Sequence, residues 1–218
     1  MKRIIVGSGR CGTKSLAAYY GGDHEPHQNP VVYLASAYSH GWVTAKHVAG
    51  LLVNLEWADT VADHKQSELI EITSQLWDCD YLWVVRNPAD TVASLVANRW
   101  YLPGDDNYPP GFLNYHGTWD GKDAETTTYN NSGNRTRGDR VGDFTVDEWT
   151  QMSQVERCGW WWGYVNKRIA VQLDKIPDRA EILRLEDHPE LLKVNVSKVK
   201  PVSGWEPYVQ EVANKLGY

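Results

Sequence analysis

The chain has 218 residues, of which 42% are hydrophobic and 23% charged, as in an ordinary globular protein. Its formal net charge of −6 disfavours nucleic acids and membranes as partners, because binding to them generally needs a basic surface. Three cysteines without metal-ligand spacing indicate free thiols in a reducing compartment. The apolar run at 4–6 is too short for a signal peptide or a membrane span, so we expect a cytoplasmic protein.

The hydrophobic pattern predicts alternating strands and helices in one domain over residues 1–218. In chain order we expect a strand at 4–6, a helix at 12–20, a mostly helical stretch at 31–56, a strand at 60–63, a helix at 67–77, a strand at 81–85, a helix from Pro88 to about 99, a long helix at 146–173, a strand at 181–185 and a helix at 208–216. Residues 101–143 have no sustained periodicity, which is typical of a functional loop that serves as a lid or a substrate contact, or of a disordered loop.

Strands that alternate with helices predict an α/β fold, a three-layer sandwich with a central parallel sheet. Ligands in such folds bind beyond the carboxyl ends of the strands. Gly7 and Arg86 each follow a predicted strand, so we expect the fold to bring the two segments that begin there close together.

The first segment, residues 7–15, reads GSGRCGTKS and predicts a P-loop-like phosphate-binding loop. Its glycines let the backbone turn sharply and direct several N–H groups at one anion, and the start of the following helix adds partial positive charge. Arg10 and Lys14 supply full charges, and Thr13 and Ser15 supply hydroxyl donors. These residue types in one short turn point to phosphate chemistry.

A nucleoside triphosphate with magnesium is an alternative ligand for this segment, because GxxxxGK[ST] is nearly matched. Thr13 separates Gly12 from Lys14, however, so the lysine comes one residue late. The clearest strand, at 81–85, is followed by Arg86 and not by a magnesium-binding aspartate. The near-match is therefore weak support for a kinase.

The second segment, residues 86–94, reads RNPADTVAS, with Asn87 and Pro88 as a strong helix start. Arg, Asn-Pro, an acidic residue and a Ser eight positions after the Arg resemble the 3′-phosphate motif of sulfotransferases that use 3′-phosphoadenosine 5′-phosphosulfate (PAPS). Residues 10–16, RCGTKSL, resemble the 5′-phosphosulfate loop of the same family. The likeness is closest to carbohydrate-type members and to small bacterial or viral members.

This resemblance implies a sulfotransferase with PAPS as co-substrate, adenosine 3′,5′-bisphosphate as product and no metal. The implied cofactor-binding residues are Gly9, Arg10, Cys11, Gly12, Thr13, Lys14 and Ser15 on the 5′ side and Arg86 and Ser94 at the 3′-phosphate. Arg10 and Lys14 are also the nearest cations to the transferred group and so are catalytic candidates.

The chain departs from the family pattern at Ser15, where members that stack adenine directly after the loop have Trp. The adenine platform therefore has no assigned residue. Residues 137–144 superficially resemble the Arg-Lys-Gly loop that closes the site in some cytosolic members, but they precede the long helix instead of following it. Residues 184–187, RLED, resemble a late Arg-Tyr-Glu-Asp segment of the family, for which we expect a structural role.

A general base must accept the proton of the acceptor hydroxyl. Glu25 is our first candidate, because Glu25-Pro26 resembles a Glu-Pro pair of carbohydrate-type members. His24 and His27 flank it and titrate in a suitable range. Directly after the strand predicted at 60–63, His64 is an alternative base and Lys65 a candidate sulfate contact.

The acceptor is expected to be a small molecule or a carbohydrate with a free hydroxyl. Eleven tryptophans and twelve tyrosines offer flat faces with polar handles, and those at 100–119 and 160–162 are the candidate wall of an acceptor site. Two further hypotheses remain open at this point, a small-molecule kinase that uses ATP and magnesium, and a nucleotide-binding module without catalysis.

Overall fold

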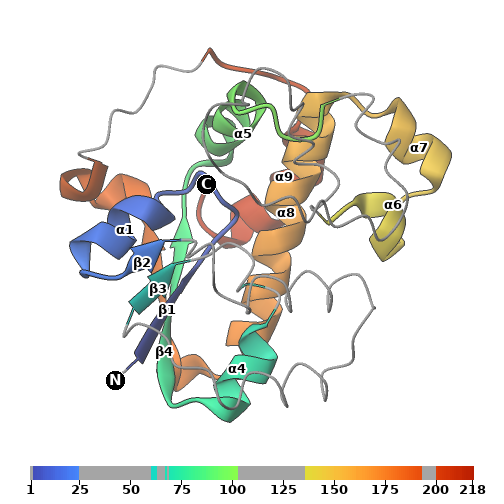
Figure 1. Cartoon of the computed structure of the whole chain (residues 1–218). Coiled ribbons are helices and arrows are strands. Elements are labelled where there is room, and N and C mark those ends of the chain that lie inside the picture. The colour runs from blue at the N-terminus through green and yellow to red at the C-terminus, as the bar shows by residue number, and fades with distance from the viewer. Residues whose placement is uncertain (1, 25–59, 63–66, 68, 103–135, 193–199) are drawn as a thin grey trace, which may run out of the picture.

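The computed structural model describes residues 2–24, 60–62, 67, 69–102, 136–192 and 200–218 (Figure 1). The strands are β1 (Lys2–Val6), β2 (Asp23–His24), β3 (Thr60–Ala62), β4 (Cys79–Val85) and β5 (Ala180–Arg184). The helices are α1 (Thr13–Tyr19), α4 (Ile70–Leu76), α5 (Pro88–Ala97), α6 (Gly138–Val141), α7 (Val146–Gln151), α8 (Gln154–Leu173) and α9 (Glu206–Lys215). In the described part of the chain the 3₁₀ turns are η3 (Pro177–Arg179), η4 (Leu185–Asp187) and η5 (Pro189–Leu192).

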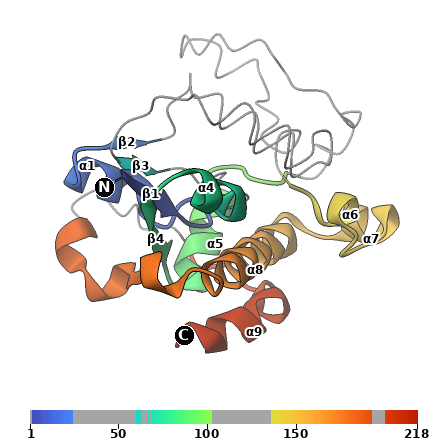
Figure 2. The same cartoon turned by 90° about the horizontal axis from the view of Figure 1, so that it is seen from below.

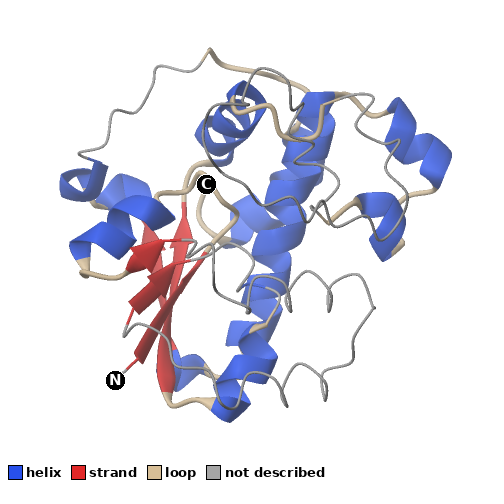
Figure 3. Ribbon diagram, viewed as in Figure 1, coloured by secondary structure: helices blue, strands red, loops and turns tan. Residues whose placement is uncertain are grey.

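The strands form one parallel sheet in the order β2-β3-β1-β4-β5, with helices around it (Figure 3). The chain leaves β1 toward β2 on one side and leaves β4 toward β5 on the other. Adjacent strands whose connections run in opposite directions mark a topological switch point, where open α/β sheets bind their ligands. The ends of β1 and β4 therefore define the expected position of a site.

Alternating side chains of β1 and β4 divide the core into two layers. Ile4 and Val6 of β1, with Tyr81, Trp83 and Val85 of β4, pack toward α5, α8 and α9. Ile5, Leu82 and Val84 pack toward α1 and the chain after β5. Figure 2 shows α1 on one side of the sheet and α4, α5 and α8 on the other. The three-layer α/β sandwich with a central parallel sheet is thus confirmed.

The prediction of one continuous helix at 146–173 is wrong, because two helices, α7 and α8, occupy this range. The backbone at Met152 and Ser153 is extended, with ψ of 138° and 163°. Ser153 and Glu156 form a capping box, in which Ser153 Oγ accepts from Glu156 N at 3.3 Å and Glu156 Oε2 accepts from Ser153 N at 2.7 Å. This capping box starts a new helix at Gln154 although the helical periodicity of the sequence continues through it.

Most other predicted elements are confirmed within a few residues. Two short elements were missed, the two-residue strand β2 and the helix α6, which lies inside the stretch predicted to be irregular. Both are held by tertiary context, which local sequence patterns do not reveal. The helical stretch expected at 31–56 and most of the 101–143 stretch lie outside the described residues. Within the described part of the chain, no helix is both long and apolar enough to cross a membrane.

Gly163 allows α8 and α9 to pack closely. A Cβ added to Gly163 would lie 2.2 Å from the backbone oxygen of Tyr208, which is closer than atoms can approach. We expect Gly163→Ala to lower the free energy of unfolding by about 2 kcal/mol through overpacking. Urea unfolding would measure the change, with Lys167→Ala on the exposed side of α8 as a control that shifts stability by less than about 0.5 kcal/mol. An unchanged midpoint in Gly163→Ala would contradict this packing.

Candidate functional site

The first segment turns sharply between β1 and α1. Gly9, Arg10 and Gly12 all have positive φ, at 75°, 56° and 99°. A left-handed conformation is costly for Arg10, because it is not a glycine. Cys11, between Arg10 and Gly12, does not have positive φ, and a turn in which left-handed residues alternate with others can direct backbone N–H groups into one concavity that binds an anion. The backbone is therefore already shaped as a cradle.

The turn packs against Trp100, which lies just after the end of α5, the helix that begins in the second segment. A Cβ on Gly9 would lie 2.9 Å from the Trp100 ring, so only glycine fits here. The Cys11 side chain is fully buried, and burial raises the pKa of its thiol to about 11. Cys11 is thus neutral and packs inward, and any contact that it makes with a ligand has to come from its backbone.

The second segment begins where β4 ends. Asn87 Oδ1 accepts a hydrogen bond from Ala89 N at 2.9 Å and Pro88 occupies the first turn, so α5 starts as predicted. The Arg86 guanidinium lies 3.6 Å from the Asp90 carboxylate and donates to the backbone oxygen of Arg10 at 3.3 Å. Arg86 therefore bridges the two segments.

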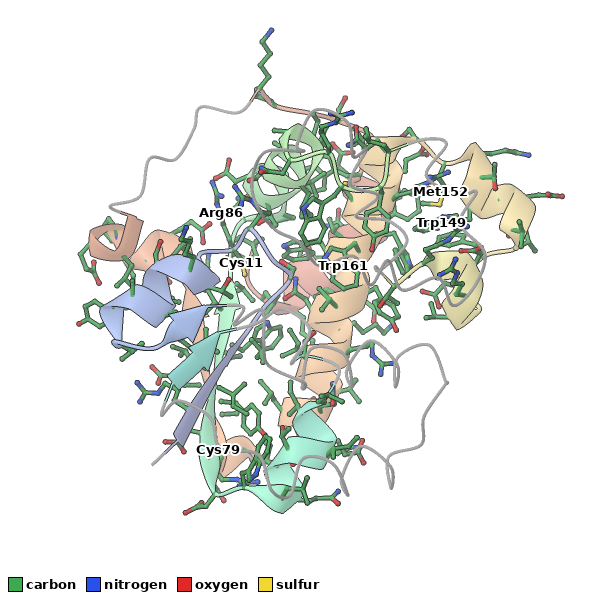
Figure 4. The ribbon with its side chains drawn as sticks, viewed as in Figure 1. Cys11, Cys79, Arg86, Trp149, Met152 and Trp161 are labelled. Atoms are coloured by element: carbon green, nitrogen blue, oxygen red, sulfur yellow. The ribbon has the colours of Figure 1, made fainter. Side chains whose placement is uncertain are left out.

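Arg10 makes a second contact between the segments. Its Nε donates to Ser94 Oγ at 3.2 Å, and Ser94 is buried on α5. Residues 84 positions apart in the sequence are thereby brought to one point at the carboxyl ends of β1 and β4. Figure 4 shows Arg86 close to the loop that contains Cys11.

Lys14 is exposed at the start of α1, Ser15 is half-buried and Thr13 is buried. With Arg10 and Arg86, Lys14 gives this edge of the sheet three cationic side chains, opposed locally by Asp90. A backbone cradle with guanidinium and ammonium groups on the same and the adjoining segment suits phosphate, since these groups form charge-assisted hydrogen bonds with its oxygens.

The candidates for the general base fall largely outside the described residues. Glu25, His27, His64 and Lys65 all lie there, and of His24 only the backbone is described, at the end of β2. β2 and β3 are parallel to β1 and end at the same edge of the sheet. Among the described residues, no group of three or more His, Cys, Asp or Glu side chains is placed to hold a metal.

Arg137 belongs to the stretch that resembles a site-closing loop, and the structure gives it a structural role. Its guanidinium donates to both carboxylate oxygens of Asp139 at 2.9 Å and lies 5.9 Å from the centre of the Trp149 ring. The pair is buried, so this charge is neutralised within the fold.

Glu186, in the segment for which a structural role was expected, supports the site from the other side. Its Oε1 accepts from the backbone N of Asn87 at 2.7 Å, and its Oε2 accepts from the Tyr218 hydroxyl at 2.9 Å. Burial and the neighbouring Glu186 raise the pKa of Tyr218, so its hydroxyl stays protonated as a donor. Glu186 thus anchors the turn between β4 and α5.

The tryptophans of α8 do not form the acceptor wall that their sequence suggested. Trp160, Trp161 and Trp162 are at most 5% exposed and belong to the main core. The indole N–H groups of Trp161 and Trp162 instead donate to backbone oxygens of the two segments. The run of three tryptophans within a predicted helix was the sequence feature that could have indicated such buried hydrogen-bond donors.

Comparison with known proteins shows a likeness of fold. No protein-family model matches the chain, and no curated protein matches it. Among solved structures, a sulfotransferase domain from the curacin biosynthetic pathway aligns over 100% of this chain and 97% of its own, with a TM-score of 0.52 and 12% identity. The chain therefore has a sulfotransferase-like fold. At this identity the likeness concerns the fold, and activity must be argued from the site.

Proposed function

We propose that this protein is a PAPS-dependent sulfotransferase that acts on a hydroxyl of a carbohydrate or small molecule. The observation that supports this most directly is the meeting of the two segments, in which Arg10 contacts Ser94 and Arg86 contacts the backbone of Arg10. A single phosphate loop suits many nucleotides. A loop joined to a second basic segment on the adjacent strand suits a nucleotide with phosphate at both its 5′ and 3′ positions.

The described residues divide into two roles in this proposal. The cradle of residues 7–12, with Thr13, Lys14 and Ser15, would hold the 5′-phosphosulfate. Arg86 and Ser94 would hold the 3′-phosphate, with Arg86 as a planar fork that matches phosphate oxygens. Gly9, Cys11 and Gly12 would contribute through their backbone.

PAPS supplies a sulfuryl group whose bond to the 5′-phosphate breaks as the acceptor oxygen bonds to sulfur. Arg10 and Lys14 would stabilise the charge that builds on the leaving phosphate, which is the type of contribution that dominates related phosphoryl transfers. Glu25 would accept the acceptor proton, with His24, His27 and His64 as alternatives, and Lys65 would contact the sulfate. No metal has a role in these steps.

Thermal unfolding with added nucleotides tests the proposal. At about 100 times its Kd, adenosine 3′,5′-bisphosphate is expected to raise Tm by about 5–10 °C, because it binds only the folded chain. ATP with magnesium should have a much smaller effect. Stabilisation by ATP and magnesium alone would support the kinase instead and would refute the proposal.

A further inference from the structure

Consecutive tryptophans of α8 each donate a hydrogen bond to one of the two segments. Trp161 Nε1 donates to the backbone oxygen of Ser8 in the first segment at 2.7 Å. Trp162 Nε1 donates to the backbone oxygen of Arg86, where the second segment begins, at 3.3 Å. Figure 4 shows Trp161 between α8 and the loop that follows β1. One helix therefore contacts both halves of the candidate site.

Helical geometry explains how neighbouring residues reach different strands. Consecutive side chains on an α-helix differ in direction by about 100°, so Trp161 and Trp162 diverge toward β1 and β4 respectively. Trp162 is completely buried and Trp161 is 4% exposed, so water does not readily replace either N–H group. A buried carbonyl that loses its donor is destabilised, which makes the Trp161 contact restrictive for the backbone at Ser8. The Arg86 oxygen also accepts from Thr91 Oγ1 at 3.4 Å, so Trp162 supplies one of two side-chain hydrogen bonds that hold it.

The position of α8 against the sheet is itself fixed. Asn166, one turn after Trp162, accepts from Trp83 Nε1 of β4 at 3.0 Å and donates to the backbone oxygen of Trp162 at 2.9 Å. The Trp161 ring also packs against Trp100, the residue beneath Gly9, with ring centres 6.3 Å apart. Helix, strand and loop are thus joined in one buried polar and aromatic network.

We infer that Trp161 and Trp162 are positioning residues that set the separation and orientation of the two phosphate-binding segments. The inference rests on the proposed function for the identity of the ligand. It deepens that proposal by giving α8 a role in selectivity. The helix would set the spacing between the two phosphate sites through the backbone of the segments, without contacting a phosphate itself. Trp161 acts on the 5′ side and Trp162 on the 3′ side.

The test compares Trp161→Phe and Trp162→Phe, with Trp160→Phe as the matched control. Trp160 also donates its indole N–H from α8, but to Asp143, which is outside both segments. Calorimetry would give Kd values for adenosine 5′-monophosphate, adenosine 3′-monophosphate and adenosine 3′,5′-bisphosphate. We expect Trp161→Phe to raise the Kd of the 5′-monophosphate, and Trp162→Phe to raise the Kd of the 3′-monophosphate, each by about fivefold to tenfold. Both variants should raise the Kd of the bisphosphate, and Trp160→Phe should change none of the three Kd values.

Hydrogen–deuterium exchange tests the positioning without any ligand. Exchange should rise in residues 7–13 for Trp161→Phe and in residues 86–91 for Trp162→Phe, and in neither for Trp160→Phe. A variant that folds poorly would be replaced by the benzothiophene isostere of tryptophan, which keeps the ring shape and lacks the N–H. Equal effects on both segments in all three variants would overturn the inference. If wild type binds no adenosine nucleotide, the proposed function fails, while the exchange pattern still decides the positioning roles.

Discussion

Arg86→Ala is expected to weaken the binding of adenosine 3′,5′-bisphosphate on the order of 100-fold, or roughly 2.7 kcal/mol. Arg86 lies at the end of β4, where its guanidinium already spans Asp90 and the first segment. In the proposed site this guanidinium supplies the charge-assisted hydrogen bonds to the 3′-phosphate. Removing it would leave the 3′-phosphate with Ser94 alone of the two residues assigned to it. Calorimetry on the purified variant would measure the loss.

Two control variants separate the effect of the Arg86 guanidinium shape from the effect of losing a positive charge. Arg86→Lys keeps the charge but loses the planar fork, so we expect an intermediate loss of about tenfold. Lys167→Ala removes one positive charge at an ion pair between α8 and α9 and should leave affinity unchanged. If Arg86→Ala binds the bisphosphate as tightly as wild type, Arg86 is not the 3′-phosphate ligand.

Glu25→Gln is expected to reduce kcat for sulfate transfer by about 10³-fold, because a general base contributes about 10²–10⁴-fold and an amide cannot accept the proton. Affinity for adenosine 3′,5′-bisphosphate should remain, since Glu25 is assigned to the acceptor side. Transfer of labelled sulfate from PAPS to a library of carbohydrate and small-molecule hydroxyls would measure the rate. Retained binding with lost transfer would also exclude a nucleotide-binding module without catalysis.

The histidine candidates form the controls for this experiment. His24→Ala, His27→Ala and His64→Ala should each reduce kcat by far less than Glu25→Gln. An active Glu25→Gln beside an inactive His27→Ala or His64→Ala would transfer the role of base to that histidine. A base of that kind would also move the acid limb of the pH profile toward the ordinary imidazole pKa of about 6.5.

The sequence was informative where local chemistry sets structure. The helix start at Asn87-Pro88, the loop glycines and the apolar runs of β1 and β4 all lie where the pattern placed them. The proximity of the two segments was predicted from one topological rule, that the ends of parallel strands share an edge, and the contact between Arg10 and Ser94 confirms it. The fold and the meeting of these two segments could therefore be predicted together.

The support beneath the site could not be predicted, because it depends on contacts between distant residues. Nothing in the local sequence of Trp161 shows that its N–H meets the backbone of Ser8, 153 positions away. Glu186 and Asn87 are 99 positions apart. The break between α7 and α8 was missed because a capping box is a single pair set within a long periodic run.

In the proposed site, the ion pair between Arg86 and Asp90 would make phosphate binding an exchange of one anionic partner of Arg86 for another. The Asp90 side chain is 62% exposed and that of Arg86 14%, so the pair itself adds little stability and Asp90 can turn toward water at low cost. An arriving phosphate would then take the place of a carboxylate beside a guanidinium that is already oriented. In this proposal Asp90 would pair with Arg86 until a ligand with more charge and more acceptor oxygens replaces it.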